Sequence, residues 1–498
     1  MKKLPTTPLL LTAHQKNIFD TIITTIESKV DTFLSSGNPE DYMLSLAGPA
    51  GTGKTFLTTQ IANYLLSKQK QLQHPEELKY HFVVTAPTHK AVSVLANLMF
   101  EQKMQVSCKT IHSFLAIKPF VDYKTGEERF MVDKTKSGKD VTSILIVDES
   151  SMVGSELYSF IRDSIIDGHI KLVLFIGDPY QLLPVNDNAN KVYELKQTFE
   201  LTEVVRQAKE SPIIQIATEL RRAIASQKFG DLRDFFEKYV NKDSDIGYLH
   251  NREDFLNAFY AKTNWHEEDK ILATYKNKDV DAFNSAIRSR YWEEQEILNP
   301  PTLLPGDKLR FKEMYGAGDV TLYSNSQVVT LEKVEKMYHN DLGIEYWECR
   351  DIDAPQQQIF RVVDPDSLKT FNEKLELIAK KAKASDYPHN QKLWKLFFSV
   401  RDMFAQVQYV HASTIHKLQG STYETVYIDL FSLLGNGYMS MDEKYRLVYV
   451  AVTRASHKLR IFLPAFGTTH TVDTRTGQEI NMVERFADID EMIEKSGF

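Results

Sequence analysis

The segment Gly48-Pro49-Ala50-Gly51-Thr52-Gly53-Lys54-Thr55 constrains the fold of this chain more than any other stretch. The apolar residues 42–47 before it predict a short buried strand, and residues 56–67 after it carry leucine and isoleucine at helical spacing. Glycines at a strand-to-helix turn let backbone N–H groups approach an anion, and the helix N-terminus adds a favourable dipole. Lys54 would reach the β- and γ-phosphates of a nucleotide, and the Thr55 hydroxyl would bind Mg²⁺. A glycine-rich turn with a surface lysine is the weaker alternative.

Length and composition set broad limits on the chain. Its 498 residues are too many for one hydrophobic core, so we expect two to four domains. No run of about 18 apolar residues is present, which predicts no transmembrane span, and the short apolar start favours mature protein over a signal peptide. Cys108 and Cys349 form neither a metal-binding spacing nor a disulfide framework, which fits a reducing cytoplasm. The net charge of −7 gives no general attraction to nucleic acid, so DNA or RNA would need a local channel.

A second strong signal is the apolar run Ser143–Val147, which is followed by Asp148 and Glu149. A continuous apolar run is typical of a strand buried on both faces of a parallel sheet. Asp148 can hold Mg²⁺ through water, while Glu149 can orient or deprotonate an attacking water. A third strand, Lys171–Ile176, leads to a turn where Gln181 is placed to sense the γ-phosphate. Together with the phosphate loop, these residues predict nucleotide hydrolysis.

Two further candidates have strong alternatives. The Gln15 amide can donate and accept, which suits an adenine edge, but the sequence alone favours a polar residue at a helix start. The guanidinium of Arg206 stays charged and can grip phosphate with two hydrogen bonds, as an arginine finger does. Taken singly, Arg206 is more typical of a surface ion pair.

The rest of the chain alternates between sheet-like and helical stretches. Strands that run into polar turns at Phe82–Lys90 and Thr110–Leu115 favour ligand contacts, with plain loops as the alternative. Residues 119–132 predict a hairpin, and an exposed aromatic there would be either a wedge or surface packing. Short β-type runs from about 302 to 365 predict a small antiparallel barrel, followed by a helical stretch rich in lysine over Ser367–Phe404. The α/β pattern begins again at 270 and returns at 412–462, where Arg454 ends an apolar segment; residues 464–498 carry no clear pattern.

Taken in order, these stretches resemble the superfamily 1B DNA helicases, most closely the phage Dda type, with RecD-like enzymes further off. The resemblance runs from Gln15 to about Phe462. It is carried by Gly48–Thr55, Thr85–Lys90, Thr110–Leu115, Asp148–Met152, Gly177–Val185, Leu201–Gln207, Ser413–Thr422 and Val448–Ser456. One departure is the turn Asn325-Ser326-Gln327, where family members often have Asn-Gly, because serine adopts a positive φ less readily than glycine.

The resemblance implies an α/β fold with two RecA-like parallel-sheet domains, a small β-hairpin insertion and an SH3-like β-barrel insertion. The implied ranges are 1–115 with 141–203 for the first, ATP-binding RecA-like domain, 116–140 for the hairpin, 204–300 with 411–498 for the second RecA-like domain, and 301–410 for the barrel with its helices. The barrel would brace the hairpin, which would act as a strand-separating pin.

The resemblance also implies roles for individual residues. ATP and Mg²⁺ would lie between the two RecA-like domains, with Gln15 reading adenine and with Arg206 and Arg454 reaching the γ-phosphate. Phe130 is the candidate aromatic of the pin, because an aromatic ring can stack on a base. The positions that match the family's strand-contacting motifs are Pro87, Thr88, His89, Thr110, His112, Thr414, His416 and Lys417.

The leading functional prediction is an ATP-dependent DNA helicase moving 5′ to 3′, with the polarity implied by resemblance alone. One alternative is a single-strand translocase that displaces proteins with little unwinding; another is a nucleotide-gated DNA-binding switch. A nuclease or polymerase is disfavoured, because no further carboxylate cluster has two-metal spacing. Expected partners are single-stranded and forked duplex DNA, and single-strand-binding or replication and recombination proteins. We expect a monomer, without membrane contact, in the cytoplasm of a bacterium or a phage-infected host.

Overall fold

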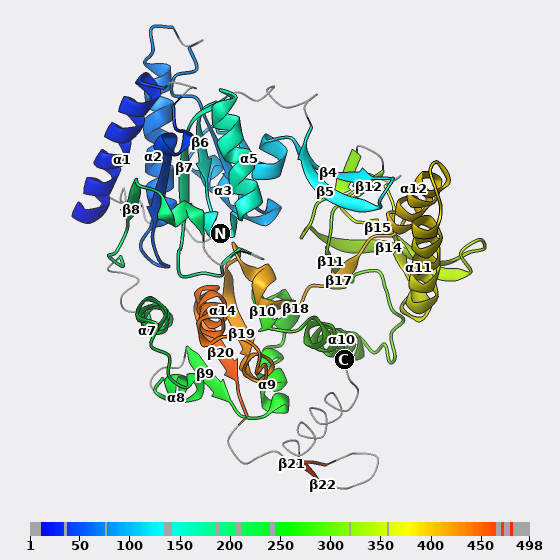
Figure 1. Cartoon of the computed structure of the whole chain (residues 1–498). Helices are drawn as coiled ribbons and strands as arrows, with labels where there is room; N and C mark the ends of the chain where they lie inside the picture. Colours follow the sequence, from blue (N-terminus) through cyan, green and yellow to red (C-terminus); the bar gives the residue numbers. More distant parts are fainter. Residues whose placement is uncertain are drawn as a thin grey trace.

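The chain folds around two parallel β-sheets, a third, antiparallel sheet, and a separate hairpin (Figure 1). The computed structural model describes residues 11–33, 37–74, 77–133, 142–184, 187, 190–205, 211–239, 245–317, 320–355, 358–464, 470–472 and 479–481. The predicted α/β class with two parallel sheets is confirmed. Among the helices described, none combines the length and apolar character needed to cross a bilayer.

The first sheet is built from strands that are apolar on both faces. Alternate residues of one strand enter different cores: Leu44 and Ile144 lie on one face, and Met43 and Leu145 lie on the other. In sheet order the strands are β3 (Cys108–Thr110), β2 (Phe82–Ala86), β6 (Thr142–Val147), β7 (Ile170–Gly177), β1 (Met43–Ala47) and β8 (Thr198–Glu200). The first face is covered by α1 (Ala13–Asp31), α2 (Lys54–Lys70) and α3 (His89–Glu101), and the second by α4 (Ile111–Phe114) and α5 (Ser155–Ile166).

The second sheet repeats this plan. Its strands are β18 (Ala412–Thr414), β10 (Lys270–Thr274), β19 (Tyr423–Asp429), β20 (Ala455–Phe462) and β9 (Ile246–Leu249), all parallel. One face packs against α7 (Pro212–Ser226), α8 (Leu232–Glu237), α13 (Leu430–Leu434) and α14 (Met441–Thr453), and the other against α9 (Arg252–Phe259) and α10 (Asn277–Glu294). The segment 211–268 is mainly helical but also supplies β9, a strand of only four residues that follows no long apolar run.

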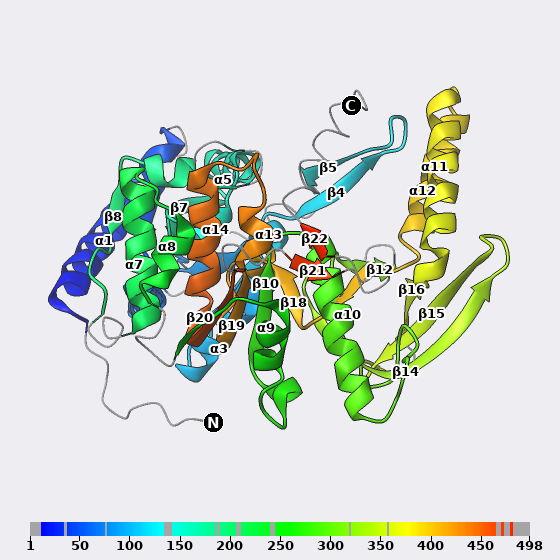
Figure 2. The ribbon, with the colours of Figure 1, turned by 90° about the horizontal axis from the view of Figure 1, so that it is seen from below.

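The third sheet is antiparallel and lies beside the other two (Figure 2). Its order is β16 (Phe360–Val363), β15 (Ile344–Asp351), β14 (Val328–His339), β11 (Lys308–Phe311) and β17 (Val407–Tyr409), with a two-stranded partner of β12 (Tyr315–Ala317) and β13 (Val320–Tyr323). Stacked rings of Phe311 and Tyr323, 4.5 Å apart, form part of its core with Phe360. The predicted helical stretch divides into α11 (Leu368–Ala384) and α12 (His389–Arg401), which pack against each other.

The predicted hairpin consists of β4 (Ile117–Asp122) and β5 (Glu127–Val132), and it extends from the first sheet toward α12 (Figures 1 and 2). The contacts that support the hairpin come from α11 and α12, the two helices of the predicted 301–410 insertion. A small pair, β21 (His470–Val472) and β22 (Glu479–Asn481), follows the second sheet. Single 3₁₀ turns complete the fold at η1 (Pro39–Tyr42), η2 (Ser150–Met152), η3 (Lys191–Glu194), η4 (Trp265–Glu267), η5 (Pro365–Ser367) and η6 (Ile415–Leu418).

Candidate nucleotide site at the junction of the parallel sheets

Strand register brings the main sequence signals to one edge of the first sheet. Ala47 pairs with Gly177, and Val147 pairs with both Thr85 and Phe175, so these parallel strands end at the same level. Because loops at the carboxyl ends of parallel strands meet, the phosphate loop, Asp148 with Glu149, and the loop after β7 lie together. We call residues 178–184 the β7 loop.

The phosphate loop has the conformation that its glycines permit. Gly51 and Gly53 have φ values of +82° and +83°, in the left-handed region that favours glycine. A Cβ atom on Gly53 would lie 2.5 Å from the amide nitrogen of Gln15, so close packing also excludes any larger side chain at this position. The ammonium group of Lys54 donates to the carbonyl of Pro49 at 3.2 Å and to that of Gly48. The lysine thus lies along the loop at the first residue of α2, the place for a phosphate contact.

Gln15 is engaged at both ends of its amide. Its oxygen accepts from the backbone N–H of Thr12 at 3.1 Å in a capping box that starts α1. Its nitrogen donates to the carbonyl of Thr52 in the phosphate loop at 3.0 Å. Gln15 therefore both caps the start of α1 and contacts the phosphate loop. Its recognition of adenine stays a prediction.

Asp148 and Glu149 differ in backbone and electrostatic setting. Burial, together with the neighbouring Glu149 charge, raises the pKa of Asp148 to about 7, and the Lys54 ammonium acts in the opposite direction. Glu149 has a φ of +50°, an uncommon value for a side chain of this size and one that often occurs at functional sites. The exposed Thr55 hydroxyl and the Asp148 carboxylate fit a Mg²⁺ ion, which is usually held by one or two protein oxygens plus substrate phosphates. The described residues contain no cluster of three or more His, Cys, Asp or Glu that could hold a metal.

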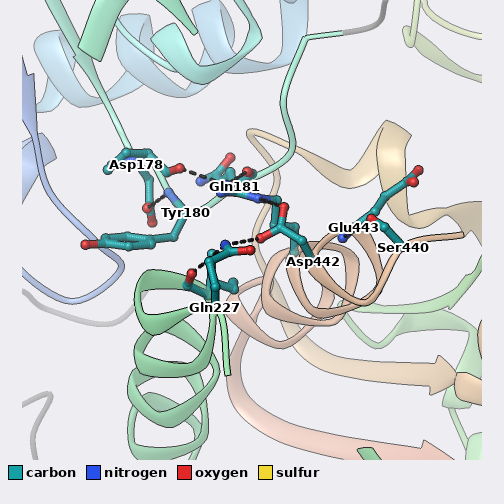
Figure 3. A network of polar contacts seen from close by, with 10 residues as sticks. Asp178, Tyr180, Gln181, Gln227, Ser440, Asp442 and Glu443 are labelled. Carbon is teal, nitrogen blue, oxygen red and sulfur yellow. Dashed lines mark hydrogen bonds and ion pairs between the residues drawn. The ribbon is translucent and has the colours of Figure 1, made fainter. Parts of the chain in front are cut away.

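The β7 loop leaves the first sheet and enters the core of the second. Leu182, 7% exposed, belongs to the apolar cluster formed by α7, α14 and the second sheet. Gln181 is buried beside Ser151, whose hydroxyl donates to its amide oxygen at 3.4 Å. Figure 3 shows Asp178, Tyr180 and Gln181 facing α7 and α14, where Gln227 donates to Asp442 at 2.9 Å.

Tyr449 of α14 joins three elements, and sequence reasoning missed it. Its hydroxyl donates to a carboxylate oxygen of Asp178 at 2.6 Å and accepts from the backbone N–H of Ala50 in the phosphate loop at 3.2 Å. One turn earlier, Arg446 donates to the carbonyls of Pro179 and Gln181 at 2.9 and 2.8 Å. A tyrosine inside an apolar helical run was the available signal, because a buried hydroxyl needs a partner.

A second contact between the sheets was also missed. Lys90, next to the predicted strand-contacting residues of the first sheet, donates to the Tyr423 hydroxyl at 2.8 Å and lies 4.5 Å from the centre of its ring. Gly420, with φ of +71°, packs so closely that a Cβ atom would lie 3.4 Å from Ala91 and 3.8 Å from Glu149. The turn after η6 therefore touches the proposed catalytic carboxylate.

Of the two predicted arginines, the structure describes Arg454 alone. Arg454 is buried and donates to the carbonyls of Ser421 and Val450 at 3.0 and 3.2 Å, and to the Thr453 hydroxyl at 3.2 Å, all within the second sheet's own unit. Arg206 lies outside the described residues. Their γ-phosphate roles stay predictions.

The predicted DNA-contacting positions follow strand ends on both sheets. Pro87, Thr88 and His89 follow β2. Thr110 is the last residue of β3 and His112 lies in α4. Thr414, His416 and Lys417 lie where β18 meets η6. The hydroxyls of Thr88 and Thr110 cap α3 and α4, as the plain-loop alternative expects.

Phe130 of the hairpin, half exposed, has its ring centre 5.6 Å from that of His112. Burial lowers the pKa of His112, which favours the uncharged form of this ring. The structure thus joins the candidate pin to the first sheet's predicted DNA positions.

Two protein-family models match separate parts of this chain. The AAA domain family matches residues 30–236, and the UvrD-like helicase C-terminal domain family matches residues 409–462. The chain is 26% identical to the ATP-dependent DNA helicase Dda of Enterobacteria phage T4 over 480 residues, covering 90% of this chain and 98% of Dda. It is 31% identical to the ATP-dependent RecD2 DNA helicase of Deinococcus radiodurans over 194 residues, covering 38% of this chain and 23% of RecD2.

Among solved structures, Pif1 helicase from Candida albicans aligns with a TM-score of 0.46 at 16% identity, covering 97% of this chain and 99% of Pif1. A Bacteroides Pif1 crystallised with ADP-AlF3 and single-stranded DNA also aligns with a TM-score of 0.46 at 16% identity, covering 92% of this chain and 95% of that one. The sequence matches confirm the predicted resemblance: this chain is similar to superfamily 1B DNA helicases of the Dda and RecD types.

Proposed function

We propose that the chain is an ATP-driven DNA helicase that moves 5′ to 3′ along single-stranded DNA and separates duplex DNA at the β4–β5 hairpin. The observation that supports this most is the Tyr449 hydroxyl, which bonds both the phosphate loop and Asp178 from the second sheet. Nucleotide binding at such a site acts directly on the contact between the two sheets. Changes in that contact would move the DNA-facing strand ends relative to each other.

In the proposed reaction, Lys54 and the loop amides hold the phosphates of ATP, and Thr55 and Asp148 hold Mg²⁺. Held there by Thr55 and Asp148, Mg²⁺ would supply charge neutralisation for the phosphates. Glu149 orients and deprotonates the attacking water. Gln181, Arg206 and Arg454 respond to the γ-phosphate, and Gln15 contacts adenine.

The proposed DNA path crosses the ends of both sheets, along the eight predicted contact positions, and ends at the Phe130 ring. The predicted domain ranges, 1–115 with 141–203, 116–140, 204–300 with 411–498, and 301–410, are part of this proposal. So is the assignment of the third sheet as an SH3-like barrel, which would carry the helices that support the hairpin.

The proposal is tested by strand displacement with ATP and Mg²⁺ on two matched duplexes, one with a 5′ and one with a 3′ single-stranded tail. We expect displacement from the 5′-tailed substrate alone. Displacement from the 3′-tailed substrate alone would contradict the proposed polarity but still support ATP-driven movement along DNA. DNA-stimulated hydrolysis with displacement from neither would favour the single-strand translocase.

The hairpin's role separates helicase from translocase. Phe130→Ala should reduce unwinding about tenfold, because base stacking on an aromatic contributes about 1–3 kcal/mol, while single-strand-stimulated ATP turnover persists. Phe120 is a matched control, since it is 54% exposed against 50% for Phe130 and lies on the neighbouring cross-strand pair that faces the other way. Equal unwinding by the Phe130→Ala and Phe120→Ala variants would contradict the proposed role of Phe130 in strand separation.

A further inference from the structure

The turn of the hairpin meets the tip of the helical pair α11–α12. The Asn390 side chain donates to the carbonyl of Lys124 at 3.0 Å, and the Lys124 ammonium lies 5.9 Å from the centre of the Tyr387 ring. Gly126 at the hairpin turn sits against Trp394, so closely that a Cβ atom would lie 2.4 Å from the indole. Two segments more than 250 residues apart therefore form one surface.

The helical side of this surface is basic in an acidic protein. Residues 379–396 contain five lysines and one acidic residue, Asp386, whereas the whole chain has a net charge of −7. All five lysines are exposed, and none forms an ion pair with an acid among the described residues. We call Lys380, Lys381, Lys383, Lys392 and Lys395, together with Lys124, the basic tip.

Packing does not account for these charges. The helical pair is held to the hairpin by apolar and ring contacts of Ala382, Trp394 and Phe398 with Val121 and Tyr123. Lys395 adds a contact 5.5 Å from the Tyr123 ring, but the other helical lysines point into solvent. Glu376, one turn before Lys380, lines a surface hollow with Lys380 and Lys383 and offsets part of this charge. The remaining like charges repel one another, so the cluster costs stability unless an anion covers it.

We propose that the basic tip binds the phosphate backbone of the duplex arm of a DNA fork, just ahead of strand separation. The inference rests on the proposed helicase function. Phe130 pairs with Pro119, four residues from Gly126 along the strand, so the turn lies about 13 Å beyond Phe130. That distance corresponds to about four base-pair steps at 3.4 Å per step, where a duplex held at Phe130 would still be paired.

The test uses the full chain with Lys380, Lys383 and Lys392 changed to Gln. Its matched control is Lys70→Gln with Lys238→Gln, exposed lysines near the ends of α2 and α8, on the opposite side of the molecule (Figures 1 and 2). Probes are a fluorescent duplex with a 5′ oligothymidine tail, the tail alone, and a fork that also carries a displaced 3′ arm. Affinity is measured over a salt series.

We expect the triple variant to bind the tailed duplex about tenfold more weakly, with the slope of log affinity against log salt reduced by about two or three. Binding to the tail alone and single-strand-stimulated ATP turnover should equal those of the control. Equal loss on the tail alone would instead assign the tip to the single-stranded track, and loss only on the fork would assign it to the displaced arm; either overturns the proposal. Unchanged binding to all probes would show that the basic tip is a solvent-exposed surface without a DNA-binding role, which also overturns the proposal. Absence of DNA-stimulated hydrolysis in the wild-type chain would instead refute the proposed function itself.

Discussion

Two of the junctions that connect the first sheet to the rest of the described structure are built differently. The nucleotide junction, where the phosphate loop and β7 loop meet α14, depends on buried polar groups: Asp178 and Tyr449 are each 1% exposed. The hairpin junction, where β4–β5 meets α12, depends on aromatic packing and on one ion pair. In that pair Arg401 donates to both oxygens of Glu128 at 2.7 and 2.9 Å, with the two side chains 31% and 41% exposed.

The difference indicates separate tasks. A buried hydrogen-bond partner cannot be replaced by water, so losing one costs about 1–3 kcal/mol. A partly exposed ion pair typically contributes about 0–1 kcal/mol, because water and salt compete for it. We infer that the nucleotide junction transmits the state of the bound nucleotide, whereas the hairpin junction sets the direction of the hairpin with little effect on stability.

The largest effect is expected from Glu149→Gln. Removing a general base should lower ATP turnover about 10²- to 10⁴-fold, while ATP still binds, because the phosphate loop is unchanged. Steady-state hydrolysis and equilibrium binding of a fluorescent ATP analogue measure the two quantities, with the exposed Glu156→Gln as control. Normal turnover in Glu149→Gln would place the reaction's base outside the nucleotide junction.

Tyr449→Phe tests whether the buried junction transmits a signal or merely holds the sheets together. The variant keeps the ring but leaves Asp178 and the Ala50 N–H without their partner, so DNA-stimulated ATP turnover should fall about tenfold.

Tyr445→Phe in the same helix is the matched control. Tyr445 is also buried, and its hydroxyl bonds both the N–H and the carbonyl of Gly230, within the second sheet's own unit. Both variants should melt at lower temperature, but only Tyr449→Phe should lose turnover per folded molecule. Equal losses of turnover would show that Tyr449 acts through stability alone.

The two junctions were not equally accessible to sequence reasoning. At the nucleotide junction, glycines at a strand-helix turn and acids after an apolar strand carry their chemistry in short local patterns, so Gly48–Thr55, Asp148 and Glu149 could be located by inspection. Tyr449 and Lys90 could not, because their partners lie hundreds of residues away and only tertiary folding supplies them. The hairpin itself was predictable from alternation, but its support by α12 depends on Trp394 meeting Gly126, a pairing that no local pattern contains.

At the hairpin junction, Arg401→Gln should have a smaller and different effect. Stability should change by less than about 1 kcal/mol. The number of strands separated per ATP should nevertheless fall about two- to threefold, because the hairpin is held less firmly. Combining the change with Glu128→Gln should add little, as expected for residues that act as a pair.

Arg361→Gln is a suitable control, since Arg361 bonds Glu348 at 3.0 Å within the third sheet at similar exposure. Unwinding is measured by strand displacement and ATP use by phosphate release on the same samples. A parallel fall in both quantities would mean that the hairpin junction also transmits nucleotide state, which would remove the distinction between the two junctions.

The smallest effect is expected from Ser326→Gly. This change lies outside both junctions, so its effect is a baseline against which the effects at the junctions are compared. Ser326 has a φ of +66°, the conformation for which related turns carry glycine, and its hydroxyl makes one exposed hydrogen bond, to the Asn325 side chain. Glycine removes the backbone strain but also gives the unfolded chain more freedom, so the net gain should be below about 1 kcal/mol. The melting temperature should rise slightly, with ATP turnover and unwinding unchanged. A lower melting temperature would show that the Asn325 contact outweighs the strain, and a change in unwinding would show that the third sheet reaches the hairpin junction through more than α12.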